Sequence, residues 1–350
     1  MQESDQSSLT VKNPAEPISA QPERRNAKVW LLLLAVLLTL GLSLFIGRYP
    51  RPFWMPPELL WQDDLALKLV LNLRLPRIIS AFLLGASLSS AGMVMQMLFR
   101  NPLVEPGFLG VSQGAAFGAA LSIVFLSSNQ LGIAANATLF AFIGLLLTYF
   151  LARYLRYGGW VLRLVLAGIA VSALFSSGVG VLKYLADPTD QLQEIVFWLL
   201  GGLWSITWKD LAFIAGPVLV GLLVIYLMRW RLNLLSLNDE TAFSLGVSVG
   251  RERAFLLTAA VMVTAAVVSV AGIVGWVGLI IPHIARRISG ANAAQAVPTA
   301  IFLGGIFGVL SDNIARTVMA GEIPLGILTS LFGAAIFAGL MVTYNLKVKQ

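Results

Sequence analysis

The chain has 350 residues, of which 58% are hydrophobic and only 12% are charged. A soluble domain carries roughly 25% charged residues, so this chain has too little polar surface to solvate a globule of its length. The composition excludes a soluble enzyme, a disordered protein and a secreted disulfide scaffold, and it indicates a polytopic membrane protein. The net charge of +7 comes from lysines and arginines that flank apolar runs, a pattern typical of membrane proteins rather than of nucleic-acid binding.

Residues 1–27 are rich in Ser, Gln, Pro, Glu and Asn, and this composition predicts a disordered cytoplasmic tail. The apolar run 29–47 follows a long polar stretch and is longer than the core of a signal peptide, so we predict a retained first membrane helix. We expect residues 28–350 to form one all-α domain, a bundle of membrane helices with a cytoplasmic loop at 229–253.

Uncharged runs separated by charges, prolines and glycines predict about ten membrane spans, because about 20 apolar residues cross a bilayer. The eighth run is too short to cross alone and carries Gly275, Gly278 and Pro282, so we predict a broken or half helix there. A short amphipathic segment, 191–205, lies between the fifth and sixth spans. The predicted spans are residues 29–47, 77–99, 108–127, 132–152, 161–182, 211–228, 254–272, 274–285, 297–315 and 324–344.

The distribution of basic residues predicts that both termini are cytoplasmic. With ten spans and the N-terminus inside, sixteen lysines and arginines fall in cytoplasmic segments and eight fall outside. Five tryptophans then lie in outer segments, as an interfacial aromatic belt would: Trp54, Trp61, Trp198, Trp204 and Trp208.

Small residues recur four positions apart in several spans. Three pairs predict close approach of helix backbones in lipid: Gly114 with Gly118, Gly304 with Gly308, and Gly168 with Ser172.

The sequence lacks the motifs of enzymes. It contains no cysteine, no GxxxxGK[ST] phosphate loop, no HExxH zinc motif and a single histidine, which disfavours an intramembrane enzyme. Asp312 is the only carboxylate that we place at membrane level, and Arg316 lies one helical turn later, so we expect the two to pair. Ion-coupled transporters place carboxylates near the midplane. Their scarcity favours transport driven by a partner protein and leaves a proton-coupled secondary transporter as the alternative.

The single histidine, His283, follows Pro282 near the end of the short eighth span. One imidazole without nearby carboxylates makes a poor proton relay. We therefore interpret His283 as a polar residue that bonds to backbone freed by the proline.

The loop 229–253 contains the pattern of a short exposed helix. Asn238 can cap it, Asp239 and Glu240 occupy the favourable first turn, and Gly246 can end it. Ala242, Phe243 and Leu245 give it an apolar face that needs a partner, this chain's own loops or the lipid surface to cover it.

Three arginines lie at outer helix ends, where the positive-inside bias does not expect them. Arg74 and Arg77 flank Pro76 at the start of the second span, and Arg316 ends the ninth. They can anchor to lipid headgroups or form a receptor for carboxylates.

Several separated motifs together resemble the FecCD family of ABC-importer permeases, which take up iron–siderophores, haem and vitamin B12, and the resemblance spans about residues 30–345. It implies ten spans per subunit, a homodimer or pseudo-dimer in the bacterial inner membrane, an extracytoplasmic substrate-binding protein, and two cytoplasmic ATPase subunits. The ATPase subunits bind the ATP and magnesium, so this chain is expected to bind no cofactor or metal and to be no enzyme itself. The motifs are Arg74-Leu-Pro-Arg77, Gln96-Met-Leu-Phe-Arg-Asn-Pro-Leu-Val-Glu-Pro-Gly-Phe-Leu-Gly-Val-Ser-Gln-Gly114, Gly272-Ile-Val-Gly-Trp-Val-Gly-Leu-Ile-Ile-Pro-His-Ile-Ala-Arg286, Ser311-Asp-Asn-Ile-Ala-Arg316 and Glu322-Ile-Pro-Leu-Gly326.

The resemblance also implies roles for residues at matching positions. It assigns ATPase coupling to the loop helix, a cytoplasmic gate to the turn after the second span, and docking of the binding protein to the outer arginines. The sequence departs from the common motif at Asn238, where the family often has Gly, and at Val104-Glu105, where Ala-Asp is commoner. The assigned residues are Asp239, Glu240, Ala242, Leu245 and Gly246 for coupling, Asn101 and Leu103 for the gate, and Arg74, Arg77 and Arg316 for docking.

The substrate is left open by the sequence. A ferric siderophore or another metal chelate is the most frequent use of the family, and haem, cobalamin and molybdate or tungstate are alternatives.

The topology can be tested with introduced cysteines, because the chain has none of its own. We predict that a cysteine at Ser7 is protected from a membrane-impermeant thiol reagent in intact cells, whereas cysteines placed within 52–64 or 205–210 react. Labelling of the Ser7→Cys variant in intact cells would contradict the predicted orientation.

Overall fold

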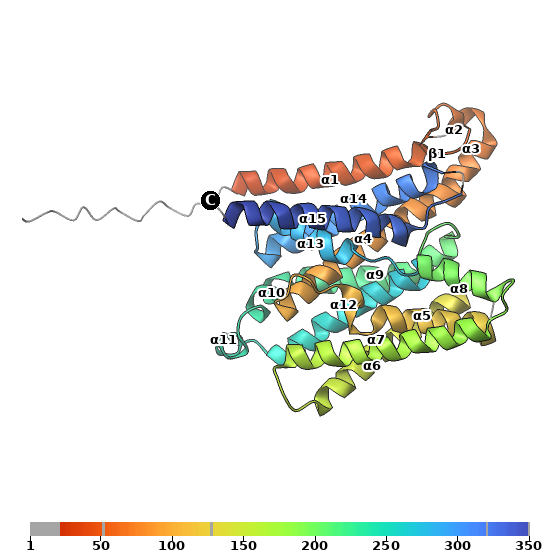
Figure 1. Ribbon diagram of the computed structural model, residues 1–350. Coiled ribbons are helices and arrows are strands. Elements are labelled where there is room, and N and C mark those ends of the chain that lie inside the picture. Colours follow the sequence, from red (N-terminus) through yellow and green to blue (C-terminus); the bar gives the residue numbers. More distant parts are fainter. Residues whose placement is uncertain (1–21, 51–52, 127–128, 320, 349–350) are drawn as a thin grey trace, which may run out of the picture.

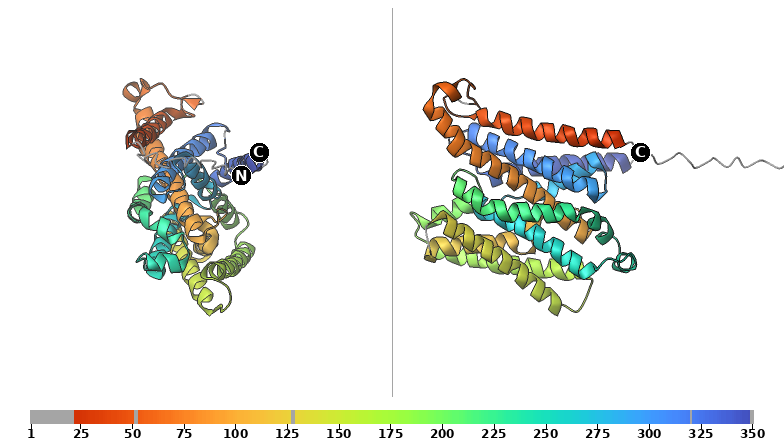
Figure 2. Two further views of the ribbon diagram at one scale, coloured as in Figure 1. Left: turned by 90° about the vertical axis from the view of Figure 1, so that its left-hand side faces the viewer. Right: turned by 180° about the vertical axis from the view of Figure 1, so that it is seen from behind.

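The computed structural model describes residues 22–50, 53–126, 129–319 and 321–348. Helices run roughly side by side between two ends of a bundle (Figures 1 and 2). The elements, in chain order, are α1 (Pro22–Phe45), β1 (Ile46–Gly47), β2 (Phe53–Trp54), α2 (Leu59–Gln62), α3 (Asp64–Leu69), η1 (Val70–Arg74), α4 (Leu75–Phe99), η2 (Pro106–Leu109), α5 (Val111–Leu121), η3 (Ser122–Leu126), α6 (Gln130–Tyr154), α7 (Trp160–Leu185), α8 (Gln191–Leu200), α9 (Trp208–Leu227), α10 (Arg229–Leu235), α11 (Asp239–Ser244), α12 (Val249–Ala271), α13 (Val277–Ser289), α14 (Ala293–Thr317) and α15 (Leu325–Val348).

The all-α class is confirmed, with a single two-residue antiparallel pair, β1 with β2, in the described part of the chain. Every predicted span contains a helix. Within the described residues, six helices are long and apolar enough to cross a membrane, and three shorter apolar helices accompany them. The predicted half helix is α13, whose 13 residues extend only about 20 Å at 1.5 Å per residue.

Two boundaries differ from the sequence prediction. Helix α1 begins at Pro22, inside the segment 1–27 predicted as a tail, and residues 1–21 lie outside the described part. The second span begins earlier than residue 77, because α3, η1 and α4 form one continuous helical stretch from Asp64 to Phe99. The wider π-helical turn of η1 directly precedes Pro76, so a proline without an N–H donor is accommodated without ending the helix.

The two ends of the bundle carry different elements. Helices α10 and α11 lie at the same end as the start of α1 and the end of α15, and we call this the α11 end (Figure 1). The β1–β2 pair, α2, α3 and α8 lie at the opposite end, which we call the α8 end. This grouping agrees with the segments that the sequence placed on opposite membrane sides.

Helix α4 is the central element of the bundle and is buried along nearly its whole length. Glycines let other backbones approach it. A Cβ atom at Gly85 would lie 1.9 Å from the carbonyl oxygen of Gly304 in α14, and one at Gly92 would lie 1.9 Å from that of Gly278 in α13. The backbones therefore touch directly, as close helix packing in lipid requires.

Two of the three predicted small-residue pairs, and Gly168 of the third, lie at such contacts. Added Cβ atoms at Gly114 and Gly118 of α5 would each meet a carbonyl oxygen of α6 at 2.4 Å, and at Gly304 and Gly308 the nearest carbonyl oxygens of α4 lie at 2.3 Å. Gly168 of α7 faces the carbonyl oxygen of Phe108 at 2.9 Å. These glycines are thus constrained by packing between helices.

We predict that Gly85→Ala destabilises the bundle, because its methyl group has no room beside the α14 backbone. Overpacking of this kind costs about 1–3 kcal/mol. Gly41→Ala in α1 is the matched control, since no atom lies within 4 Å of its added Cβ and alanine favours a helix by about 1 kcal/mol over glycine. Thermal unfolding in detergent, followed by tryptophan fluorescence, should show a lower midpoint for Gly85→Ala only. Equal midpoints would contradict the tight contact.

Candidate functional site

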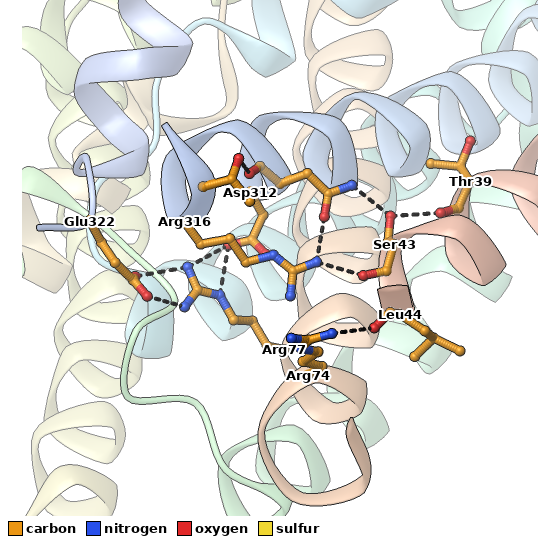
Figure 3. A network of polar contacts seen from close by, with 10 residues as sticks. Thr39, Ser43, Leu44, Arg74, Arg77, Asp312, Arg316 and Glu322 are labelled. Atoms are coloured by element: carbon orange, nitrogen blue, oxygen red, sulfur yellow. Dashed lines mark hydrogen bonds and ion pairs between the residues drawn. The ribbon is translucent and has the colours of Figure 1, made fainter. Parts of the chain in front are cut away.

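The three arginines assigned to docking lie in one polar network at the α8 end (Figure 3). Arg74 and Arg77 lie about one turn apart on η1 and α4, and Asp312 and Arg316 lie one turn apart on α14. Glu322 reaches the network from the connection between α14 and α15. The fold therefore brings together residues that are more than two hundred positions apart in the sequence.

Arg77 is held by two carboxylates. Its Nη1 and Nη2 donate to the two carboxylate oxygens of Glu322 at 2.7 and 2.9 Å, a bidentate pair. Its Nε donates to Oδ1 of Asp312 at 2.9 Å, and its Nη2 lies 2.8 Å from the same oxygen. This geometry uses most of the donor capacity of the guanidinium group.

Arg316 is turned toward α1. Its Nη2 donates to the carbonyl oxygen of Ser43 at 2.8 Å and to the side-chain oxygen of Asn313. The expected pairing with Asp312 is present at 3.7 Å, but Arg77 is the nearer partner of that carboxylate. The Ser43 hydroxyl accepts from Asn313 at 2.6 Å, so α1 and α14 are joined at this level.

Arg74 also bonds within the chain. Its two terminal nitrogens donate to the carbonyl oxygens of Leu44 (2.8 Å) and Tyr49 (3.1 Å). Arg74, Arg77 and Arg316 are only 8, 8 and 7% exposed. Their guanidinium groups are therefore largely buried, because carbonyls and carboxylates of their own subunit surround them. Their docking role stays a prediction. Glu322, whose side chain is 34% exposed, is the member that sequence reasoning left without a role.

The turn assigned to the gate lies at the α11 end, where α4 stops. Arg100 ends the helix in a left-handed conformation, with φ of 50°. The side-chain oxygen of Asn101 accepts from the N–H of Leu103 at 2.9 Å. The backbone N–H of Asn101 donates to the carbonyl of Gln96 at 3.1 Å. Leu103 is 57% exposed, so the turn presents an apolar side chain on a fixed backbone.

Gln96, one turn before this point, corrects the interpretation of His283. The carbonyl that Pro282 leaves without a helical donor is that of Gly278, and it accepts from Nε2 of Gln96 at 3.2 Å. His283 instead lies with Nδ1 3.3 Å from the carbonyl of Leu279. Arg286 donates to the Gln96 side-chain oxygen at 2.6 Å, so Gln96 ties α4 to α13.

The predicted loop helix is present as α11, Asp239–Ser244. Gly246 follows it with φ of 78°, as the expected helix end requires. Phe243 is 76% and Leu245 55% exposed, whereas Ala242 is buried. The apolar surface that α11 offers is thus Phe243 with Leu245, and Ala242 packs inward, because its position on the helix faces the chain's own loop.

The start of α11 is held by two arginines. Asp239 accepts from Arg253 at 2.9 Å and lies 3.3 Å from Arg100, and the hydrogen bond from Arg253 holds the pKa of Asp239 below its usual range. The sequence predicted that the Asn238 side chain caps the helix, but it does not. Its Oδ1 accepts a hydrogen bond from Arg100 at 2.8 Å instead. Arg100 and Arg253 carried no predicted role.

Two cavities lie one after the other along residues 264–278, where α12 gives way to an irregular segment before α13. The first, of about 320 Å³, is lined in part by Gln130, Glu194 and Ser205, and the second, of about 300 Å³, by Glu105 and Gln113 among others. Among the described residues, no lysine or arginine lines either cavity. Glu105 thus lies among the helices, although the sequence placed only the carboxylate of Asp312 at membrane level. Across all the residues that the structure describes, no group of three His, Asp or Glu side chains could hold a metal ion.

We predict that Asp312→Asn lowers stability strongly, because Arg77 and Arg316 would lose a carboxylate that is itself 2% exposed. Removing one partner of a buried ion pair costs about 3–5 kcal/mol. Arg231→Gln removes a surface pair with Glu252 and is the control, since such pairs contribute about 0–1 kcal/mol. Unfolding midpoints in detergent measure both. Similar midpoints for the two variants would show that the network does not hold the helices together.

Known proteins resemble this chain over almost its whole length. The sequence profile of the FecCD transport family matches residues 32–343. The chain is 38% identical to the molybdate import system permease protein MolB of Haemophilus influenzae, covering 93% of this chain and 98% of that one. It is 42% identical to a probable iron chelatin transport system permease protein of Helicobacter pylori, covering 78 and 82%.

A solved structure agrees with the sequence relatives. It is described as an inward-facing conformation of a metal-chelate type ABC transporter and superimposes with a TM-score of 0.84 and 36% identity, covering 91% of this chain and 99% of that chain. The profile match alone spans far more than half of the sequence. The chain therefore belongs to the FecCD transport family.

Proposed function

We propose that this chain is the permease subunit of an ABC importer that carries a metal chelate, most specifically a ferric siderophore. The observation that carries the proposal is the exposed apolar surface of Phe243, on α11, and Leu245, directly after it. A short helix in a loop between membrane helices exposes two large apolar side chains only at a cost, unless a partner covers them. An ATPase subunit that inserts between such loops is the partner implied by the family.

The substrate is supported by relatives rather than by a binding constellation. A relative named for iron chelatin transport and a structural neighbour described as a metal-chelate type transporter both favour a metal chelate. Because another relative is named as a molybdate import permease, an oxyanion is the alternative substrate. Among the described residues, no lysine or arginine lines either cavity, so neither cavity offers the basic side chain that would bind an oxyanion directly.

Assembly and orientation belong to the same proposal. Two permease subunits, as a homodimer or pseudo-dimer, would bind two ATPase subunits at the α11 end, in the cytoplasm of a bacterial cell with both termini on that side. The substrate-binding protein would dock at the α8 end. There Arg74, Arg77 and Arg316 are the residues proposed for docking; their contacts also hold the surface in shape, and Glu322 is the partly exposed group next to them.

The gate assignment is supported by geometry. Asn101 fixes the backbone of the turn through its bond to the Leu103 N–H, and Leu103 projects from it half-exposed. A rigid turn with one projecting apolar side chain can narrow a passage between two subunits. Proton-coupled secondary transport, the alternative function, has no comparable use for an exposed α11.

The ATPase contact is tested by Phe243→Asp combined with Leu245→Asp. Because the two side chains are exposed, the fold should survive, but a carboxylate buried against the partner without a counter-charge should release the ATPase subunit. Tyr157→Asp, which alters a 63% exposed aromatic in the α6–α7 connection, is the control. Co-purification of the co-expressed ATPase subunit measures the effect. Undiminished co-purification with the double variant would refute the assigned contact.

Transport by the same complex separates the two candidate functions. In proteoliposomes containing the ATPase subunits and the binding protein, uptake of an iron-55-labelled ferric siderophore should require ATP and ignore a proton gradient. Uptake driven by the gradient without ATP would favour the secondary transporter. Uptake of labelled molybdate in place of the siderophore would retain the importer and change its substrate.

A further inference from the structure

A closed series of contacts joins four elements at the α11 end. Arg100, at the end of α4, donates to Asn238 (2.8 Å) and lies 3.3 Å from Asp239, at the start of α11. Asp239 accepts two bonds from Arg253, near the start of α12, at 2.9 and 3.4 Å. The sequence analysis singled out Asn238 and Asp239 for their helix-starting pattern, but the two arginines joined no predicted site.

Aromatic contacts close the series. The guanidinium carbon of Arg253 lies 3.7 Å from the centre of the Trp160 ring, at the start of α7, within cation–π range. The Trp160 ring in turn lies 5.4 Å from the Phe99 ring, measured between centroids. Phe99 is the residue before Arg100, so the contacts return to the end of α4. We call these residues the α4–α11 ring; they are Phe99, Arg100, Trp160, Asn238, Asp239 and Arg253.

The ring has a buried side and an exposed side. Phe99 is 3% exposed and the Arg253 side chain 8%, so this side is packed against the bundle. The side chains of Arg100 and Asp239 are 38 and 50% exposed. Packing fixes the buried side, whereas the exposed side is held only by polar contacts that solvent can replace. The exposed side is therefore where relative movement of α4 and α11 costs least.

Arg100 also begins the gate turn. Its left-handed backbone reverses the chain, and the next residue is Asn101, whose side chain holds the N–H of Leu103. A displacement of α11 that keeps the bond from Arg100 to Asn238 moves the backbone that leads directly into the turn. A displacement that breaks both contacts of Arg100, with Asn238 and with Asp239, leaves the start of α11 held by the bonds from Arg253 to Asp239.

We propose that Arg100 is a positioning residue that connects the ATPase-docking helix α11 to the gate turn 101–103. Through it, movement of α11 changes the turn. The proposal rests on the proposed function, because it takes α11 as the ATPase contact and the turn as the gate. It adds a residue and a route that neither assignment contains.

The same geometry makes the role separable from folding and from docking. An exposed ion pair adds little stability, so removal of the Arg100 guanidinium should leave the fold intact. The docking surface, Phe243 with Leu245, lies further along the loop. Its backbone is held independently of Arg100, because the N–H groups of Gly246 and Val247 donate to the carbonyls of Phe243 and Ala242. Loss of the Arg100 guanidinium should thus uncouple the docking surface from the gate turn, while the ATPase subunit still binds and the turn keeps its structure.

The test is Arg100→Gln in the full complex with the ATPase subunits and the binding protein. We expect the ATP hydrolysed per ferric siderophore transported to rise about fivefold or more, the lower range of coupling between distant sites. The unfolding midpoint and the amount of co-purified ATPase subunit should equal those of wild type. Arg231→Gln, which removes another exposed arginine–carboxylate pair at this end, should leave the ratio unchanged.

A second set of variants separates a route through α11 from a general effect of charge. Arg100→Lys, which keeps the charge, should restore part of the coupling. Asn238→Ala removes the acceptor without changing any charge and should raise the ratio in the same direction. Added to Arg100→Gln, it should have no further effect, because both changes break the same contact.

The outcomes distinguish the inference from the proposed function. If Phe243→Asp with Leu245→Asp keeps its ATPase subunit and uptake needs no ATP, the proposed function itself fails. If the ATPase binds and drives uptake but Arg100→Gln couples like Arg231→Gln, the inference is overturned. It is also overturned if Arg100→Gln releases the ATPase subunit, which would make Arg100 a docking contact, or if the effects of Arg100→Gln and Asn238→Ala simply add.

Discussion

The direct backbone contact of α4 with its neighbours is the constraint on which the rest of the structure depends. In lipid, apolar side chains gain little by leaving the solvent, so helices associate by close packing and by satisfied polar groups. Gly85 against Gly304 and Gly92 against Gly278 bring α14 and α13 to the surface of α4. With side chains excluded from these contacts, the register of α4 against both helices is fixed. Arg77 then meets Asp312 at one end, and Gln96 meets the Gly278 carbonyl near the other.

Because α4 is continuous and buried, it carries both candidate sites on one rigid rod. Arg77 and Arg100 lie about 35 Å apart along it, at 1.5 Å per residue. The two ends differ in kind. At the α8 end, arginines and carboxylates are enclosed by α1, α4 and α14 and hold the helices together. At the α11 end, the contact of Arg100 with Asp239 is half-exposed and joins the end of α4 to the short helix α11, which suits a part of a transporter that must rearrange.

The three arginines show that a sequence motif can locate side chains in the fold without indicating what those side chains contact. The sequence placed all three at helix ends on one side of the membrane, and their side chains do gather at one end of the bundle, the α8 end. The sequence did not indicate which groups bind these arginines, because whether an arginine faces solvent depends on which carbonyls and carboxylates the other helices bring to it. Ala242 shows the same limit on a smaller scale: α11 begins and ends as predicted, but its inward face is set by the packing of the loop on the bundle.

The sequence by itself determined the all-α class, the helical segments, the short α13, the loop helix and the family, since apolar length, helix-ending residues and local motifs are properties of contiguous residues. Its small-residue pairs also indicated backbone contacts correctly. Only the tertiary structure decided the partners: Glu322 on Arg77, Gln96 on the carbonyl that Pro282 frees, and Arg100 and Arg253 on Asp239. Each of these contacts joins residues of different elements, and the distance between two such side chains is set by how the helices pack, which no local pattern encodes.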